Sequence, residues 1–489
     1  MIARAAQLSR HAALRHHAVL ETATLAGVLA VAAFVWSRDV HTYPNFDEGN
    51  YLGSLDALRH GQHLGRDVFL DQPPGWYLLL VAVSYPFGNT VTGVRTGLMV
   101  TTLAAVAAAY ACGRLLAGPV AGLLAASVMS VARPLAGFAG LVESEPASAA
   151  LAAVSVALAV AAYTRRSRPG LAFLSGVVLA LATAVKLPGA TAGLPVAALA
   201  ILCGSGPLWR RLLPPVAGAA VVVAALAAAY HDVLPQIWHG VFTTHARILG
   251  QGTAASNTHR AITFVDPRTP FGCLVIAGAA ASIAVVARGR RRRALLALWT
   301  WAVGGYGFVL AMHPLSDHHL VFLAVSLALP AGVGLGALAA DLRTPLVAAG
   351  LVAAVAGLVA LGVVKNHREI VGANVAEPRE MRWAVEQLRT HTPPGRLVVS
   401  DLPIVPYLAR RQMPGQLIDT SIARIAFEDL TPEQVLRLID ESHVSAAVIG
   451  RMFQTKPEIV AGIRRRFAHR LHEPISIGGY VDVLYGPRR

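Results

Sequence analysis

The chain has 489 residues, of which 55% are hydrophobic and 14% charged, and its mean hydropathy is +0.54. Soluble domains carry about 25% charged residues, so this composition excludes an ordinary soluble protein and predicts an integral membrane protein. The net charge of +15 suggests nucleic-acid binding, but the basic residues gather in short connectors between apolar blocks. That distribution is typical of cytoplasmic loops. We therefore expect the lipid bilayer as a partner and no nucleic acid.

The first apolar segment, at about residues 18 to 36, follows a basic N-terminus that contains Arg4, Arg10 and Arg15. No small-residue cleavage site follows, since the segment ends at Trp36-Ser37-Arg38-Asp39. The pattern predicts a retained signal anchor with the N-terminus in the cytoplasm.

Two adjacent carboxylates, Asp47 and Glu48, come next in the sequence Asn45-Phe46-Asp47-Glu48-Gly49-Asn50-Tyr51. Acids at a membrane surface are costly to desolvate and usually mark a working site. The alternative is a structural cap, in which both acids stabilise the positive N-terminal end of a helix.

The apolar block at about 74 to 87 follows Asp71-Gln72-Pro73-Pro74 and is flanked by Pro86 and Gly88. It is short, so we predict a half-inserted or juxtamembrane helix. Ten further blocks are predicted spans, at 91–112, 117–136, 146–163, 170–185, 187–203, 212–230, 270–287, 294–312, 320–340 and 345–364. With the first segment this gives about 11 spans, with 13 as the alternative.

This threading places every basic connector on the cytoplasmic side, namely Arg114, Arg165 to Arg168, Arg210 and Arg211, Arg288 to Arg293, and Arg343. The connectors that contain acids and histidines then lie outside. We predict a multi-pass plasma-membrane protein with residues 1–365 as the transmembrane domain.

Residues 366–489 have an ordinary soluble composition and are predicted to form a small extracytoplasmic α/β domain. An amphipathic helix is expected at 378–390 and strands at 396–400 and 444–449. Thr431 is the expected N-cap of a helix that Pro432 and Glu433 begin.

A second acidic cluster, Glu143-Ser144-Glu145-Pro146, precedes the block at 146–163. Either these acids contact a substrate, or they mark a routine helix start with Pro at the first position.

Lys186 is the single lysine before the end of the last predicted span, and it stands beside a Pro-Gly break. Its compact ammonium suits a phosphate oxygen, so we expect a contact with a phosphate. The alternative is a side chain that extends to the membrane interface.

The run His313-Pro314-Leu315-Ser316-Asp317-His318-His319 lies before the block at 320–340. Successive residues of an α-helix point about 100° apart, so we do not expect His318 and His319 to share a zinc ion unless the backbone is irregular there, and we assign no metal ligands. Either these histidines donate hydrogen bonds to a phosphate or sugar, or they are part of an interfacial helix start. His245 and Arg247 are further candidates of this type.

The order of these features resembles the polyprenyl-phosphate-sugar glycosyltransferases of the GT-C fold, within the protein O-mannosyltransferase and aminoarabinose transferase group. The resemblance spans roughly residues 18 to 364. It includes the Asp-Glu loop after the first span, the Pro-Pro start, the acid before Pro146, the Lys186-Leu187-Pro188-Gly189 break and a Pro-Leu-x-x-His-His run of actinobacterial-looking members.

The resemblance implies a GT-C-like helical membrane fold and an inverting transfer of a sugar, mannose, arabinose or similar, from a polyprenyl-phosphate donor. The acceptor is a hydroxyl of a glycan, lipid or protein. Asp47 is the implied general base. The expected substrate contacts are Glu48, Tyr51, Glu143, Glu145, Lys186, His245, His318 and His319. No cofactor is certain, and a divalent cation is left open. The alternative function is a polytopic transporter or lipid flippase.

Overall fold

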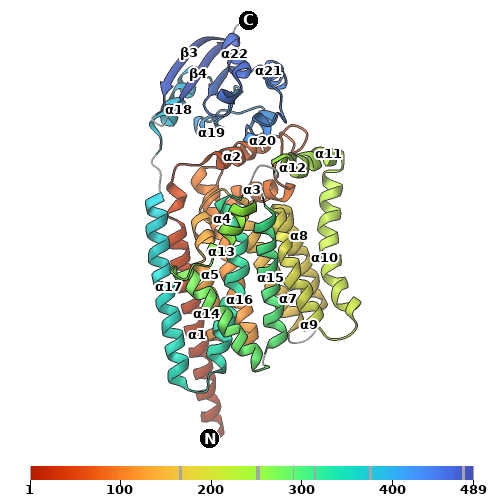
Figure 1. Cartoon of the computed structure of the whole chain (residues 1–489), viewed down its shortest axis with the longest axis vertical. Coiled ribbons are helices and arrows are strands. Elements are labelled where there is room, and N and C mark those ends of the chain that lie inside the picture. The colour runs from red at the N-terminus through yellow and green to blue at the C-terminus, as the bar shows by residue number, and fades with distance from the viewer. Residues whose placement is uncertain are drawn as a thin grey trace.

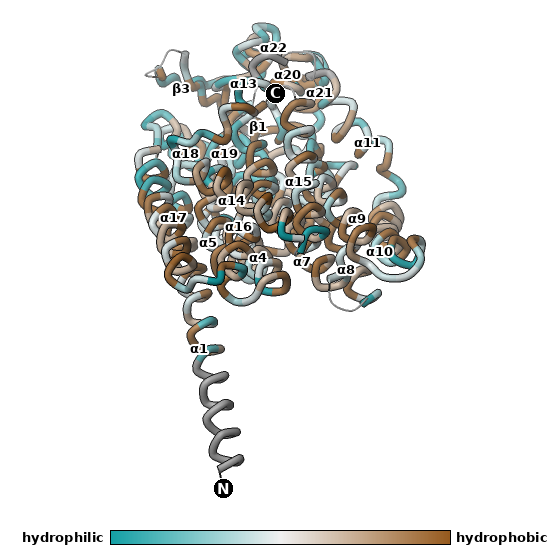
Figure 2. Tube along the Cα trace, turned by 60° about the horizontal axis from the view of Figure 1, so that its bottom comes forward, coloured by the Kyte–Doolittle hydropathy of each residue, from teal (hydrophilic) through white to brown (hydrophobic). Residues whose placement is uncertain are grey.

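A computed structural model of the chain describes residues 2–164, 168–248, 254–289, 291–312, 315–373, 377–475 and 479–487. The basic connector at 165–167, Arg290, the His313-Pro314 pair and the side chain of Arg247 lie outside the described part of the chain. Long helices run side by side through the molecule, and a small sheet domain covers one end of the bundle (Figure 1). Hydrophobic residues predominate in the helical layer, and hydrophilic residues are more frequent at its two ends (Figure 2).

Eight helices of the described residues are long and apolar enough to cross a membrane. They are α1 (Ile2–Trp36), α4 (Val91–Ala117), α7 (Ser144–Tyr163), α10 (Leu208–Ala229), α14 (Pro270–Ala287), α15 (Arg292–Ala311), α16 (Leu320–Asp341) and α17 (Pro345–Ala373). The prediction of a polytopic α-helical membrane protein is confirmed.

Three shorter apolar segments pack within the bundle: α5 (Pro119–Ser130), α8 (Pro169–Val185), and the pair η2 (Leu187–Ala192) and α9 (Gly193–Leu202). With the eight long helices they correspond to the eleven predicted segments. The block predicted at 117–136 is broken, because α5 stops before Arg133-Pro134 and α6 (Arg133–Phe138) begins there.

Helix α3 (Pro74–Phe87) is the short Pro-started helix expected from the sequence. Its 14 residues cover about 21 Å at 1.5 Å per residue, which is less than the roughly 30 Å of a hydrocarbon core. It lies beneath α2 (Phe46–Arg59), next to the sheet domain (Figure 1).

The connector between the predicted spans 212–230 and 270–287 is largely helical where it is described. It contains η3 (His231–Val233), α11 (Leu234–Trp238), the π-turn η4 (His239–Thr243), α12 (Thr244–Ile248) and α13 (Ala254–Thr263). Gly240 in the π-turn is needed for a close approach, since a Cβ there would lie 1.9 Å from the carbonyl oxygen of Leu70. π-turns are frequent at functional sites, and this one places His245 on the cavity described below.

The C-terminal domain has a four-stranded sheet in the order β1-β2-β4-β3, formed by β1 (Val398–Ser400), β2 (Ala446–Ile449), β3 (Phe467–Pro474) and β4 (Tyr480–Pro487). Strands β1 and β2 are parallel, and β4 is antiparallel to both of its neighbours. The two predicted strands are β1 and β2. The predicted N-cap is confirmed, since Thr431 and Gln434 form a capping box at the start of α21 (Pro432–Glu441).

The remaining helices of this domain are α18 (Arg379–His391), α19 (Ile404–Ala409), η6 (Gly415–Leu417), α20 (Ile422–Ile425), η7 (Phe453–Thr455) and α22 (Pro457–Arg466). Helix α18 is the predicted amphipathic helix. One apolar core joins the domain to the bundle, because Tyr51 of α2 and Trp76 of α3 belong to the same buried cluster as Ile404 and Val448. The division at residue 366 stays a prediction.

Candidate active site

A cavity of about 1140 Å³ lies between the end of the helical bundle and the C-terminal domain. Its polar lining comes from segments that are far apart in the sequence, including Asp47, Glu143, Lys186, His245 and His318. Tyr51 and His319 also line it. Seven of the nine predicted site residues therefore meet at one cavity, and Glu48 and Glu145 lie behind its wall.

The first turn of α2 positions Asp47. The side chain of Asn45 caps this helix by accepting a hydrogen bond from the backbone N–H of Glu48, at 2.9 Å. The cap fixes where the helix starts and directs Asp47, the second residue of the helix, to the cavity. Burial raises the pKa of the Asp47 carboxyl, and nearby Asp71 raises it further, while His318 and Lys186 act in the opposite direction.

Glu48 has a structural position that differs from the expected substrate contact. Its carboxylate accepts hydrogen bonds from Nε and Nη2 of Arg95, at 2.7 and 2.6 Å, and from the backbone N–H groups of Asn45 and Val142. Both Glu48 and Arg95 are fully buried. Because these four donors occupy the carboxylate, Glu48 holds the loop in place and does not reach a ligand in the cavity.

Arg95 is a structural residue that the sequence analysis missed. It lies on α4, and its Nη1 donates to the carbonyl oxygens of Asp39, Val40 and Thr42 at 2.7 to 3.1 Å. The guanidinium therefore ties the end of α1 to the start of α2. The available signal was a single arginine within an otherwise apolar block, and such residues seldom lack a partner.

The start of α7 carries the second pair of acids. Glu143 lines the cavity and accepts a hydrogen bond from Nδ2 of Asn45 at 3.1 Å. Burial raises the pKa of Glu143 well above its ordinary value, and the charges of Asp47, Glu145 and Glu48 raise it further. Glu145 is fully buried, with one carboxylate oxygen 3.0 Å from Nζ of Lys186.

Lys186 stands where α8 ends and the chain becomes extended. Its side chain lines the cavity and is mostly buried, so the ammonium faces Glu145 and the cavity together. The start of α3 packs directly on this region, because a Cβ at Gly75 would lie 2.6 Å from the carbonyl oxygen of Ala184. The end of α8 at the Pro188-Gly189 break and the close packing of Gly75 against Ala184 together fix the position of Lys186.

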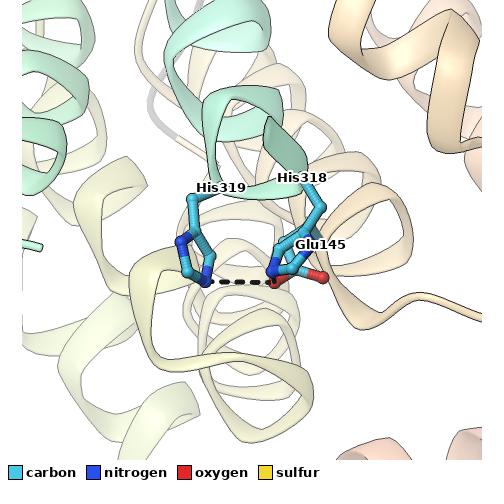
Figure 3. Close-up of side chains that lie close together, drawn as sticks. All are labelled: Glu145, His318 and His319. Carbon is cyan, nitrogen blue, oxygen red and sulfur yellow. Dashed lines mark ion pairs between the residues drawn. The ribbon is translucent and has the colours of Figure 1, made fainter. Parts of the chain in front are cut away.

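His318 and His319 lie in the short 3₁₀ turn η5 (Asp317–His319), and both rings point toward Glu145 (Figure 3). Their Nε2 atoms are 3.7 and 3.8 Å from the same oxygen of Glu145, and the ring centroids are 4.3 Å apart. The structure corrects the expectation that these rings diverge. Successive residues of a 3₁₀ turn are about 120° apart, so the two rings meet at one oxygen of Glu145 despite the local backbone geometry and not because of it.

Two overlapping groups of side chains have the spacing of metal ligands within the described residues. One consists of Asp47, Glu143 and His318, and the other of Glu145, His318 and His319, with ligand atoms within 4.8 Å in each group. Carboxylate and imidazole ligands suit Mn²⁺ or Zn²⁺. The first group fits a divalent cation better, because the ammonium of Lys186 already occupies the oxygen of Glu145 that the second group would use.

His245, which follows the π-turn, lines the cavity, and burial lowers the pKa of its imidazole. Three further charged residues of the lining, Asp71, Asp419 and Arg451, were not predicted. Asp71 could have been considered from the sequence, because it is an acid just before Pro73-Pro74. It accepts a hydrogen bond from the hydroxyl of Tyr77 at 2.7 Å. Asp419 and Arg451 gave no local signal, because only the docking of the C-terminal domain brings them to the cavity.

The fold is shared with solved glycosyltransferases. ArnT from Cupriavidus metallidurans, in a crystal structure with undecaprenyl phosphate, aligns with a TM-score of 0.70 at 16% identity over 96% of this chain and 100% of that chain. Its apo structure aligns with a TM-score of 0.69. The chain has a GT-C glycosyltransferase fold.

Two further comparisons agree with this fold. The Archaeoglobus fulgidus oligosaccharyltransferase, solved in complex with Zn and sulfate, aligns with a TM-score of 0.54 at 13% identity, over 93% of this chain and 72% of that chain. Residues 71–231, a third of the chain, match the dolichyl-phosphate-mannose-protein mannosyltransferase family. The match includes Glu143 and Lys186 and ends before His318. No curated protein sequence matched the chain.

Proposed function

We propose that this GT-C protein is an inverting glycosyltransferase that moves a sugar from a polyprenyl phosphate to an acceptor hydroxyl. The observation that carries the proposal is the placement of Asp47 on the cavity wall, in the same cavity as Lys186 and His318. A carboxylate that can accept a proton thus shares a cavity with groups that can neutralise a phosphate. The crystal structure of ArnT with undecaprenyl phosphate supports the donor class, and the family match to mannosyltransferases supports the reaction.

Asp47 is the general base of this proposal. An acceptor hydroxyl has a high pKa and needs a base within hydrogen-bond reach of its proton. As the acceptor oxygen attacks the anomeric carbon from the side opposite the phosphate, its proton passes to Asp47. The bond between the sugar and the phosphate oxygen breaks, and its electron pair stays on the phosphate. The raised pKa of Asp47 makes the carboxylate a better proton acceptor than an exposed aspartate.

Lys186 is the group that stabilises the departing phosphate. Polyprenyl phosphate leaves as an anion, so positive charge aids its departure more than an acid does. Glu145 holds the ammonium in place, and His318 and His319, next to the same oxygen of Glu145, supply further N–H donors. Tyr51, Glu143 and His245 are proposed to hold sugar hydroxyls. A divalent cation bound by Asp47, Glu143 and His318 would supply further positive charge for the sugar and phosphate oxygens.

The proposed orientation puts the cavity and the C-terminal domain on the outer face of the plasma membrane, with the N-terminus in the cytoplasm. Single cysteines at Gln387 and Ser316, in a variant without Cys112, Cys203 and Cys273, should react with an impermeant reagent added from outside. A cysteine at Gly289 should not react. The reverse labelling pattern would contradict the orientation.

The reaction is tested by incubating the purified protein with a panel of radiolabelled polyprenyl-phosphate sugars and membrane extract. We expect label to move from one donor to an acceptor fraction, which identifies the sugar, whether mannose, arabinose or another. Movement of intact labelled lipid across proteoliposome membranes without transfer would instead favour a flippase. The inactive control is Asp47→Asn, and the matched control is Asp56→Asn, which lies on the same helix but does not line the cavity.

A further inference from the structure

The C-terminal domain forms the wall of the cavity opposite the helical bundle. Asp419, Ile422, Phe427, Arg451 and Met452 all line it. A domain that only covered the bundle would not need charged groups on this wall. These side chains are therefore candidates for contacts with the part of a substrate that lies away from the membrane.

The loop that carries Arg451 is held in one conformation. It follows β2, next to the loop that follows the parallel strand β1, and ligands of α/β sheets bind at the carboxyl ends of such strands. Asp401, fully buried after β1, accepts hydrogen bonds from the backbone N–H groups of Gly450 and Phe453 at 2.6 and 2.7 Å. A Cβ at Gly450 would lie 2.2 Å from the side chain of Leu402, so the loop also packs tightly.

The guanidinium of Arg451 lies 5.5 Å from the ring centroid of Phe46, the residue before Asp47. Arg451 is exposed, and no carboxylate of the described residues forms an ion pair with it. The cation on the bundle side, Lys186, already has Glu145 as a partner. Arg451 is thus a second cation of the cavity, and its cation–π contact with Phe46 leaves its N–H groups for a ligand.

We propose that Arg451 binds an oxyanion group of the acceptor, a carboxylate or a phosphate, and so selects acceptors that carry one near the reacting hydroxyl. The planar guanidinium matches both groups with paired hydrogen bonds. Asp47 and Asp71 disfavour a second anion on the bundle side of the cavity, where the donor phosphate is proposed to occupy Lys186. The charges therefore orient the acceptor with its anionic group at Arg451 and its hydroxyl toward Asp47. The inference rests on the proposed glycosyltransferase function.

The test measures equilibrium binding to the purified full-length protein in lipid nanodiscs, without turnover. The probes are n-octyl β-D-glucuronide, n-octyl β-D-glucoside 6-phosphate and the neutral n-octyl β-D-glucoside. We expect at least one anionic probe to bind roughly 10- to 150-fold more tightly than the neutral probe, which corresponds to about 1.5–3 kcal/mol for a hydrogen bond to a charged group. Arg451→Ala should abolish this preference, and Arg451→Lys should restore part of it. Undecaprenyl phosphate should bind all variants equally.

Arg437→Ala is the matched control, because Arg437 is an exposed arginine of the same domain on α21 and does not line the cavity. The proposal is overturned if the wild-type protein binds all three probes equally, or if Arg451→Ala keeps the preference. Weaker binding of undecaprenyl phosphate to Arg451→Ala would also overturn it, because Arg451 would then contact the donor. A preference that depends on Arg451 in a protein that transfers no sugar would separate the two proposals, since only the transferase function would fail.

Discussion

The starts of α2 and α7 each carry two acids, and at each helix start the two acids face different surroundings. Asp47 and Glu143 line the cavity, whereas Glu48 is bound to Arg95 and Glu145 to Lys186. Asn45 links the two turns, since its side chain caps α2 and donates a hydrogen bond to Glu143. An acid at a membrane surface is therefore not by itself a sign of catalysis. Whether such an acid is available to a ligand depends on its partner, because an acid paired with a buried cation stabilises the fold instead.

The largest expected effect separates the two acids of α2. Asp47→Asn keeps the size of the side chain but removes its ability to accept a proton, and base catalysis contributes typically about 100- to 10,000-fold. We expect turnover to fall by that order while donor binding persists. Single-turnover rates and donor binding, measured beside Asp56→Asn, test this. Wild-type turnover in Asp47→Asn would exclude Asp47 as the base.

Glu48→Gln should affect folding instead of chemistry. Removing one partner of a buried ion pair costs about 3–5 kcal/mol, because the other charge is left uncompensated. We expect lower thermal stability in detergent, with near-normal turnover for each folded molecule. Replacing Glu48 and Arg95 together by Gln and Met should recover part of the lost stability. If Glu48→Gln had normal stability but lost turnover, Glu48 would be a substrate contact and not a structural residue.

A smaller effect is expected for donor binding when Lys186 and its partner Glu145 are changed one at a time. Lys186→Ala removes a charged contact to the donor phosphate, which is typically worth about 1.5–3 kcal/mol, so donor affinity should fall about 10- to 150-fold. Glu145→Gln keeps the ammonium and should not weaken donor binding. Binding of labelled undecaprenyl phosphate measures both, with Lys365→Ala in α17 as a control, because Lys365 does not line the cavity. Equal donor affinity in Lys186→Ala and wild type would exclude the phosphate contact.

Much of the bundle follows from local sequence. Apolar blocks give the helices, and the polar runs at 45–51, 143–146 and 315–319 mark segments that the fold brings together. The meeting of the His318 and His319 rings at Glu145 was not predicted, because the pair lies in the short turn η5, where a regular helical spacing does not apply. Strand β3 was not predicted, since it is an edge strand with charged and polar side chains and lacks an apolar alternation. Strand β4 was also missed, although its sequence is largely apolar and buried.

The missing part of the site depends on contacts between distant segments. Glu48 and Arg95 lie on different helices. The local sequence therefore does not predict whether Arg95 pairs with Asp47 or with Glu48. The same holds for Arg451, which reaches Phe46 only because α2 packs against α19. A Cβ at Gly49 would lie 2.7 Å from the backbone nitrogen of Ile404. Tertiary packing of this kind decides which charges face the cavity.

The smallest expected effect concerns the pH dependence of the acid that faces the cavity on α2. Asp47 acts as a base only when ionised, so turnover should fall as pH decreases through its pKa. Because burial and then Asp71 raise that pKa while His318 lowers it, the fall should occur above the ordinary pKa of about 3.9 for an aspartate.

Asp71→Asn removes a like charge and should move the acidic limb of the pH–rate profile to lower pH, whereas His318→Asn should move it to higher pH. Asp56→Asn is the matched control, because Asp56 lies on the same helix as Asp47 and does not line the cavity. Shifts of the same sign in Asp71→Asn and His318→Asn would show that the titrating group is not Asp47.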